Sequence, residues 1–389
     1  MQCRTPSALH RIGFMAQRAF PLDRLRTAMT FIVLFGHTWM TYGADGDWFY
    51  REVPGSRSPF SVLGTLYCLT NQAFLMGFFF LIAGYFTAAS TDRKSMVRFL
   101  ADRAVRLGLP LLGFGLVLAP LTVGMIGAAS GQGFWASIAS LWQHKEFING
   151  PMWFAEALFL LSFGYCLWRL VSNLRTEWAP TSQPHSKPIP GNLTWLIGAV
   201  AVGITAFVIR IWMPVDTRYF GLWLGYFPSY ILLFSVGIYA WRFKWLFQLT
   251  WKQARQWLIV ACLAWPVMPA AAIVLKLRGN NPYFAGGMTA ASLLYALWEP
   301  FVAWGLIAAG LVLFETHFVK PSAILSWLSR RSYAVYVIHP PILVGVCLLF
   351  RHWHAPSPVK FAVAATLGTV ATWGAADPLV RLPGLRRIF

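Results

Sequence analysis

The chain has 389 residues, of which 57% are hydrophobic and only 12% are charged, and its mean hydropathy is +0.56. Soluble domains carry roughly 25% charged residues, so this composition all but excludes a water-soluble enzyme, and it also excludes a disordered chain. The net charge of +19 is spread between apolar segments. It therefore indicates a membrane protein and not a nucleic-acid-binding one.

Ten apolar segments are long enough to cross a bilayer, for which a helix needs about 20 mainly apolar residues. In chain order they cover residues 27–43, 66–89, 107–128, 152–171, 193–213, 222–241, 255–277, 287–314, 332–350 and 359–377. Prolines within several of them predict kinks, which membrane helices tolerate when neighbours satisfy the freed carbonyls. The sequence predicts an all-α, polytopic membrane helix bundle of about ten transmembrane helices.

Lysine and arginine are distributed unequally between the two sides of this predicted bundle. With the N-terminus inside, 23 of these residues lie in inner segments and 9 in outer ones. Because cytoplasmic segments carry the excess of these residues, both termini are predicted to be cytoplasmic. We divide the chain into a basic N-terminal segment (1–22), a transmembrane domain (23–380) and a short tail (381–389). A proline-rich inner linker of low order is expected over 172–192.

The first segment reads LDRLRTAMTFIVLFGHTWM from Leu22 and contains Arg26 and His37. Eleven positions correspond to three helical turns plus about 20°, so both side chains point the same way. Eleven rises of about 1.5 Å put His37 roughly 16 Å deeper than Arg26, near the middle of the bilayer. The pattern predicts a surface cation and a buried imidazole along one helix face. An anchoring arginine, with a histidine bonded to a neighbouring helix, is the alternative.

A second pair of basic residues, Arg103 and Arg106, lies at the inner end of the third segment. Residues three apart share a helix face, so the two guanidiniums are able to grip a phosphate or carboxylate together. With Arg24 and Arg26, four basic groups gather at two helix starts. Coenzyme A, with its phosphates and long thin arm, suits such a mouth leading to a deep histidine. Ordinary anchoring of the pair at the inner surface is the alternative.

Glu156 and Glu299 are the only glutamates in their segments. Polar residues within spans are costly and often functional. Glu299 lies roughly 18 Å in from the outer end of its helix, so it is expected to be paired, protonated or in a wet cavity. A role in orienting His37 or binding sugar hydroxyls competes with a structural hydrogen bond. Glu156 lies nearer the outer end, where substrate binding competes with a structural or a solvated role.

No metal site is expected. The five cysteines form no close pair, so neither a disulfide framework nor a zinc site is predicted. His352 and His354 flank Trp353 in the last outer loop, without an acidic or cysteine partner nearby.

Five stretches, in this order, resemble the acyltransferase-3 family of integral-membrane acyltransferases. They are the pattern Leu22-Asp23…Leu25-Arg26…His37, GFFFLIAGYF (77–86), RAVRLGLP (103–110), PMWFAEAL (151–158) and SYAVYVIHPP (332–341). The layout is more similar to the branch that adds succinyl groups to periplasmic glucans than to the branch with an extra hydrolase-like domain. Two positions depart from the family pattern. Ala83 stands where serine is frequent, and Pro151 where histidine is frequent, so no role is carried over to either side chain.

The resemblance implies transfer of an acyl group from cytoplasmic acyl-CoA to a hydroxyl of a glycan or lipid-linked sugar across the membrane. His37 would be the central group, either as general base or as a transiently acylated nucleophile. Arg26, Arg103 and Arg106 would hold the phosphates of the donor or stabilise developing negative charge. By resemblance the acyl group is small, acetyl or succinyl, and no metal takes part.

Three further candidate site residues are Asp23, His339 and Trp153. Asp23 is expected to orient Arg26, or else to cap the helix start. His339 fits the family motif as a substrate-binding residue, or else bonds carbonyls freed by the proline kink. Trp153, among other outer aromatics, is expected to stack on a sugar ring. The expected partners are acyl-CoA, the glycan or lipid-linked sugar acceptor and membrane lipids, with no nucleic acid and a homodimer left open.

The expected location is a bacterial inner membrane, where the chain is a multi-pass protein. The alternative function is a polytopic secondary transporter or exporter without acyl transfer. Ten kinked spans with isolated carboxylates fit that class. However, transporter halves often show repeated patterns, and none is present in this sequence.

Overall fold

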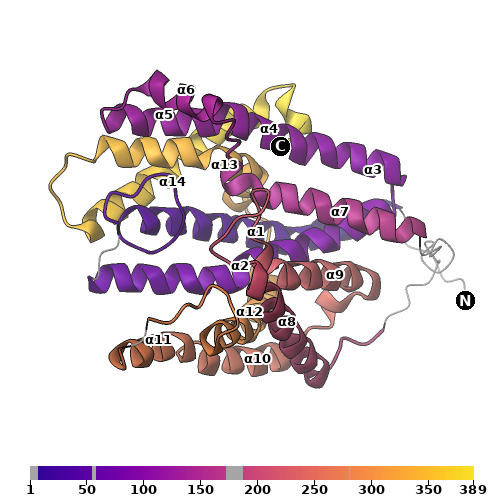
Figure 1. Cartoon of the computed structure of the whole chain (residues 1–389). Helices are drawn as coiled ribbons and strands as arrows, with labels where there is room; N and C mark the ends of the chain where they lie inside the picture. The colour runs from indigo at the N-terminus through magenta and orange to yellow at the C-terminus, as the bar shows by residue number, and fades with distance from the viewer. Residues whose placement is uncertain (1–7, 55–57, 172–186, 280) are drawn as a thin grey trace, which may run out of the picture.

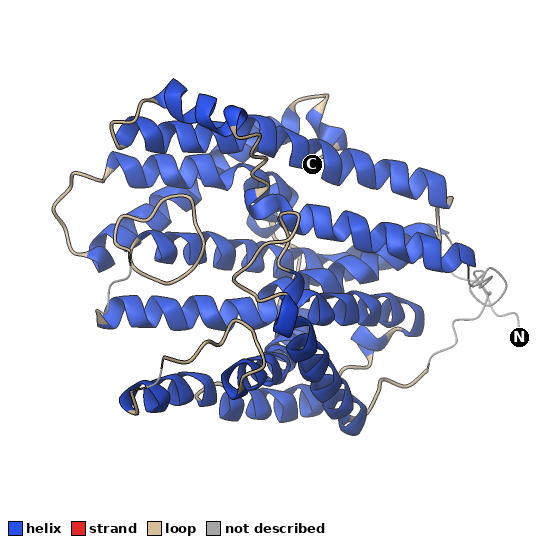
Figure 2. Ribbon diagram, in the orientation of Figure 1, coloured by secondary structure: helices blue, strands red, loops and turns tan. Residues whose placement is uncertain are grey.

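The computed structural model describes residues 8–54, 58–171, 187–279 and 281–389, with side chains described from Pro21 onward except that of Arg387. Over these ranges the chain is helical and contains no strand; only an isolated bridge joins Tyr219 and Leu222 (Figure 2). Most of the long helices lie side by side in one bundle (Figure 1). The all-α prediction is confirmed.

In the part of the chain that the structure describes, ten long helical stretches build the bundle, several of them divided. The α-helices are α1 (Ala8–Thr41), α2 (Pro59–Thr91), α3 (Met96–Arg103), α4 (Leu109–Gly113), α5 (Ala119–Ala129), α6 (Phe134–Gln143), α7 (Trp153–Val171), α8 (Asn192–Trp212), α9 (Phe227–Phe243), α10 (Trp251–Ala264), α11 (Val267–Leu277), α12 (Ala290–His317), α13 (Ala323–Leu349) and α14 (Ser357–Arg381). Short turns of other types are the π-helices η1 (Ala104–Gly108) and η2 (Phe114–Leu118) and the 3-10 helices η3 (Gly150–Met152), η4 (Leu224–Tyr226), η5 (Trp245–Phe247) and η6 (Leu385–Arg387).

Each of the ten predicted spans lies in one of these stretches, apart from at most three residues at an end. In the described residues, nine stretches are long and apolar enough to cross a membrane; α1 is not among them, because its charged beginning lowers its hydropathy. The backbone of α1 already begins at Ala8, well before the predicted span, and so includes much of the predicted basic segment 1–22. Residues 1–7, and most of the predicted linker 172–192, lie outside the described residues.

Two features of the chain differ from the predicted pattern of ten simple helices. The predicted outer loop 129–151 contains the short helix α6, which packs against α5. The third span is a succession of α3, η1, α4, η2 and α5, in which Pro110 and Pro120 interrupt the helical hydrogen-bond ladder. A proline has no N–H to give to the carbonyl four residues earlier, and such sites favour local π turns.

Helix α1 lies at the centre of the bundle, in contact with α2, α12, α13 and α14. Polar contacts support this position. The Tyr67 hydroxyl donates to the carbonyl of Ile32 at 3.1 Å, and Thr27 Oγ1 lies 3.0 Å from the hydroxyls of both Ser329 and Ser332 on α13. Within a bilayer such bonds hold helices together, since burial of apolar surface gives little preference for protein over lipid.

Helices α2 and α9 pack closely against each other, because each presents a glycine to the other. A Cβ placed on Gly84 would lie 2.0 Å from the carbonyl oxygen of Phe234, and one on Gly237 would lie 2.0 Å from that of Leu81. Small residues at a crossing let helix backbones approach closely, as is common between membrane helices. Gly84 belongs to the GFFFLIAGYF stretch, so this part of the motif has a packing reason.

The outer face of the bundle is apolar. In the most apolar window of the Trp251–Leu277 stretch only 11% of residues are buried, and Leu263 and Leu277 are among the large exposed side chains. An exposed apolar surface of this extent marks a lipid-facing perimeter.

We expect Gly84→Val to destabilise the protein by about 1–3 kcal/mol or more, because the new side chain meets backbone atoms that cannot move aside without separating α2 from α9. Thermal unfolding of the detergent-purified protein measures the loss. Gly164→Val is the matched control, since a Cβ at Gly164 has open space around it. Equal melting temperatures for the two variants would contradict the close α2–α9 contact.

Candidate functional site

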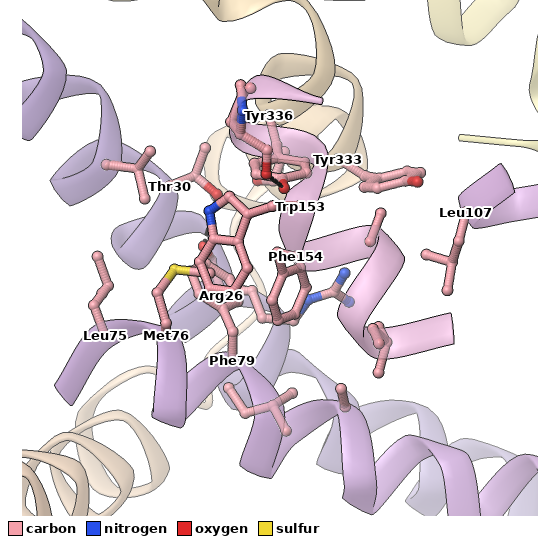
Figure 3. Close-up of a pocket in the computed structure, with 18 of the residues that line it drawn as sticks. Arg26, Thr30, Leu75, Met76, Phe79, Leu107, Trp153, Phe154, Tyr333 and Tyr336 are labelled. Carbon is pink, nitrogen blue, oxygen red and sulfur yellow. Dashed lines mark hydrogen bonds between the residues drawn. The ribbon is translucent and has the colours of Figure 1, made fainter. Parts of the chain in front are cut away.

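One cavity of about 2680 Å³ runs through the bundle and is lined mainly by α1, α2, α3–η1, α7 and α13. Figure 3 shows Trp153 and Phe154 of α7, Tyr333 and Tyr336 of α13, and Phe79 of α2 grouped with Arg26 around this space. Along α1 its lining extends from Asp23 to Met40, which is about 25 Å of helix and close to the thickness of the hydrocarbon core.

The face of α1 that borders the cavity carries Arg26, Thr30, Val33, His37 and Met40. These positions follow each other at intervals of three or four residues, which is the spacing of one helix face. Arg26 and His37 therefore share one wall of one cavity, as their spacing predicted.

Basic residues gather where the cavity meets the start of α1, a region we call the basic end. Its nine members are Arg26, Arg93, Lys94, Arg98, Arg103, Arg106, Arg330, Arg331 and Arg386. Asp23 and Asp102 are the carboxylates of this region that also line the cavity. Arg26 Nη1 lies 3.5 Å from Asp23 Oδ1, so the predicted pairing of these two residues is present. The excess of positive charge suits an anionic ligand.

The paired arginines reach the basic end in a way that the sequence did not predict. Arg103 is the last residue of α3, and Arg106 lies in the π-helix η1, so the assumed spacing along one α-helical face does not apply. Both still line the cavity. Arg103 donates to Thr87 Oγ1 at 2.9 Å. Pro110 lacks the N–H that would bond the carbonyl of Arg106, and the Tyr333 hydroxyl donates to that carbonyl at 2.5 Å.

Arg24, which the sequence grouped with these arginines, has a different position. It is buried and donates to the carbonyls of Phe318 and, at 2.5 Å, Lys320, just after α12. It does not line the cavity. Arg24 therefore joins α1 to the end of α12, because the last carbonyls of a helix lack intrahelical donors.

His37 lies between two aromatic neighbours. The indole of Trp48 stacks on its ring, with centroids 3.9 Å apart and planes 14° apart. The imidazole of His339 lies with its centroid 5.2 Å away, again at 14°. Nδ1 of His37 is buried and has no hydrogen-bond partner among the described residues. His339 is completely buried, and its Nδ1 lies 2.8 Å from the carbonyl oxygen of Tyr336.

Beyond His37 the cavity has a different lining, which we call the aromatic end. Its members are Asp45, Asp47, Trp48, Phe49, Trp153, Asp216, Arg218 and Trp223. An ion pair between Asp47 and Arg218 joins the loop after α1 to the loop after α8. Trp153 packs edge-on against Trp223, with centroids 5.4 Å apart. Carboxylates and indole rings together are able to bind hydroxyls and the apolar faces of sugars.

The loop that carries Trp48 is firmly attached. Glu52 pairs with the buried Lys360 at 2.6 Å, and its backbone N–H donates to the carbonyl of Thr41 at 2.9 Å. Burial, and next the Glu52 carboxylate, raises the pKa of the Tyr50 phenol to about 12. The contacts of Glu52 hold the loop, and with it Trp48, in place over His37.

Glu299 pairs with Arg210, a contact that the sequence did not predict. Both side chains are almost fully buried, and the Arg210 guanidinium lies over the rings of Tyr226 and Tyr295, 5.2 and 5.1 Å from their centroids. These tyrosines line the cavity, whereas Arg210 and Glu299 do not. Among the described residues no hydrogen bond joins Glu299 to His37, so the predicted orienting contact is absent.

Glu156 also lies outside the cavity lining. Its Oε2 accepts a hydrogen bond of 2.9 Å from the amide of Asn149, which also donates to the carbonyl of Gly221 at 3.1 Å. These bonds tie the start of α7 to the loop before η4. Substrate binding by Glu156 stays a prediction that this geometry does not favour.

Several residues of the site were not found from the sequence. Arg210 did carry a signal, as the lone charged residue of its predicted span. Arg98, Arg330 and Arg386 were interpreted only as part of the inner positive charge. Trp48 was expected only among the outer aromatics that stack on sugar rings. Its position over His37 was not predicted, because a loop without periodicity does not reveal where it returns to the bundle.

Within the described ranges, no group of three or more His, Cys, Asp or Glu side chains has the geometry of a metal site. Residues 22–377 match the sequence pattern of acyltransferase family 3, described as an acyltransferase domain. The chain belongs to this family. Comparisons with curated proteins and with solved structures gave no significant match. The long apolar helices and the family together make the chain an integral-membrane acyltransferase.

The two departures from the acyltransferase-3 pattern both lie at the cavity. Ala83 and Pro151 belong to its lining. The hydroxyl of Tyr336 donates to the carbonyl of Pro151, so this position contributes its backbone to the site although its side chain has no polar group.

We expect Arg210→Met to destabilise this acyltransferase by about 3–5 kcal/mol, because it leaves the Glu299 carboxylate buried and unpaired. The double variant Arg210→Met with Glu299→Met should recover most of the loss, since both charges are removed together. Thermal unfolding in detergent compares the variants. If the losses simply added, the two residues would not form a coupled pair.

Proposed function

We propose that this protein is an O-acyltransferase that moves a small acyl group from acyl-CoA to a hydroxyl of a glycan or lipid-linked sugar on the opposite side of the membrane. Beyond family membership, one observation carries the proposal: His37 borders a single cavity between the basic end and the aromatic end. A phosphorylated donor and a polyhydroxyl acceptor are thus able to meet at one imidazole. A transporter has no support from the family assignment.

The basic end suits the donor. The phosphates of coenzyme A carry several negative charges, and guanidinium groups bind phosphate through charge-assisted, often bidentate hydrogen bonds. Arg103 is fixed by its bond to Thr87, and Arg26 is paired with Asp23, so both are oriented before a ligand binds. The pantetheine arm would then follow the face of α1 toward His37. This arrangement supports acyl-CoA as donor over a lipid-linked one.

In the proposed step, His37 is the general base. It takes the proton of the acceptor hydroxyl while the hydroxyl oxygen attacks the thioester carbonyl. The new C–O bond forms, the C–S bond breaks, and the coenzyme A thiolate receives the proton from His37. The products are an ester and free coenzyme A, and no further reactant is needed. General-base catalysis of this kind typically contributes about 10²–10⁴-fold.

The aromatic end suits the acceptor. Trp153 and Trp223 offer indole faces, and Asp45, Asp47 and Asp216 offer hydrogen-bond acceptors for hydroxyls. Glycans combine apolar ring faces with many hydroxyls. A hydrophobic acceptor chain would find carboxylates an unfavourable surface.

The charge distribution supports a cytoplasmic basic end. Lysines and arginines are in excess on the side of the chain that holds Arg26, Arg103 and Arg106. Acyl-CoA is a cytoplasmic metabolite, so donor entry at this end agrees with that orientation. The acceptor would then lie on the periplasmic or extracellular face of a bacterial inner membrane.

His37→Ala should reduce acyl transfer by about 10²-fold or more while the protein still inserts and binds donor, because only the base is removed. Radiolabelled acetyl-CoA and succinyl-CoA are supplied to inverted membrane vesicles, with β-glucan oligosaccharides enclosed as acceptor. The wild-type protein should label the enclosed sugar. Turnover of His37→Ala near that of the wild type would remove His37 from the mechanism, and no labelling by the wild type would contradict this function.

Arg103→Ala combined with Arg106→Ala should raise the Kd for acyl-CoA by about tenfold or more, because two charge-assisted contacts to phosphate are lost. The effect should shrink as salt is added, since salt screens such contacts. Lys252→Ala combined with Arg255→Ala is the control. It removes two exposed cations at the same spacing, and neither lines the cavity. Equal Kd values for acyl-CoA in the two double variants would show that Arg103 and Arg106 only anchor the helix at the inner surface.

A further inference from the structure

Helix α13 contains a carbonyl that has lost its helical donor. In an α-helix the N–H of residue 340 would bond the carbonyl of Tyr336, but residue 340 is proline and has no N–H. His339 Nδ1 lies 2.8 Å from that carbonyl oxygen. A buried carbonyl without a donor is costly within a bilayer, so this bond has a clear structural cause.

The same bond determines which nitrogen of His339 carries the proton. A carbonyl oxygen only accepts hydrogen bonds, so Nδ1 must be the donor, and in the neutral ring Nε2 is then an acceptor. Nε2 is buried and has no partner among the described residues. Helix α13 therefore holds an imidazole with an unused lone pair, and its orientation follows from Pro340.

The ring that carries this lone pair lies beside His37. The ring centroids of Trp48 and His37 are 3.9 Å apart, those of His37 and His339 5.2 Å, and those of Trp48 and His339 5.9 Å. The lines from the His37 centroid to the centroids of Trp48 and His339 therefore meet at close to a right angle. The three ring planes are within 14° of parallel, and His339 is displaced to the side of the Trp48–His37 stack. An in-plane N–H···N bond of normal length separates two imidazole centroids by roughly 5 Å.

We propose that His339 is a positioning residue for His37: its Nε2 accepts a hydrogen bond from Nδ1–H of His37. This inference deepens the proposed function and rests on it. The bond would direct the lone pair of His37 Nε2 toward the acceptor hydroxyl. It would also stabilise the imidazolium that forms when His37 takes the proton.

A general base such as His37 needs, besides the acceptor hydroxyl, a further group that orients it. Catalytic bases are usually oriented by a partner on their other nitrogen, most often a carboxylate. In the described part of the chain no carboxylate bonds His37, and its Nδ1 is buried without a partner. The two partnerless nitrogens, one on each ring, are complementary. Their bond is not formed in this structure, but catalytic hydrogen bonds often tighten only when substrate binds.

The central test replaces His339 with Leu and, separately, with Gln. Leu fills similar space but has no acceptor, so kcat should fall by about 10- to 100-fold while the KM for acyl-CoA changes less than about twofold. Gln supplies an amide N–H for the Tyr336 carbonyl and an oxygen for His37, so it should restore kcat at least partly. Binding of acetyl-CoA and succinyl-CoA, with the melting temperature, shows that each variant is folded.

Two neighbouring prolines provide a matched pair. Pro340→Ala restores the N–H that competes with His339 for the Tyr336 carbonyl, and kcat should fall about fivefold. Pro341→Ala makes the same chemical change one residue later, where the affected carbonyl is that of Val337. It should leave kcat close to the wild-type value, because the bond of His339 is untouched.

Three outcomes would overturn the inference: wild-type kcat for His339→Leu, a Gln variant as slow as Leu although both bind donor normally, or equal kcat for the two proline variants. The proposed function fails differently. It fails if wild-type protein transfers no acyl group, or if His37→Ala is fully active. An active wild type with an inactive His37→Ala and an unaffected His339→Leu would reject only the role of His339.

Discussion

Within a bilayer every backbone carbonyl needs a donor from the protein, and the prolines of this chain repeatedly remove one. Side chains then supply the missing bond. Tyr333 donates to the carbonyl of Arg106, and His339 donates to that of Tyr336. Trp298 donates to the carbonyl of Trp265, whose helical donor would be the N–H that Pro269 lacks. Two of these three bonds lie at the cavity. The requirement that weakens the helices thus also fixes the orientation of Tyr333 at the basic end and of His339 beside His37.

Buried charge follows the same rule, and it separates structural groups from candidate functional ones. Arg210 and Glu299 neutralise each other behind the cavity wall, and Arg24 is used by carbonyls at the end of α12. The basic end is different. Nine cations line the cavity there. Three of them are paired with carboxylates, namely Arg26 with Asp23, Lys94 with Asp102 and Arg331 with Asp377, so the cations remain in excess. An excess of charge facing a cavity is best explained by a ligand of opposite charge.

Periodicity and composition predicted most of the fold, because the length of an apolar segment is set by the thickness of the bilayer. The shared face of Arg26 and His37 followed from helical geometry alone. Long-range contacts did not follow. The partner of Glu299 lies 89 positions earlier in the chain, and Trp48 comes from an aperiodic loop. The π turn at Arg106 arises from a local proline, which shifts side chains without changing the hydropathy pattern.

The indole of Trp48 over His37 bears on how much acyl donor would be lost to hydrolysis. An imidazole able to activate a sugar hydroxyl activates water equally well, and a thioester attacked by water is wasted. Under the proposed function, the indole covers one face of the His37 ring and excludes water from that side. Retention of this cover would therefore govern the ratio of ester formed to coenzyme A released.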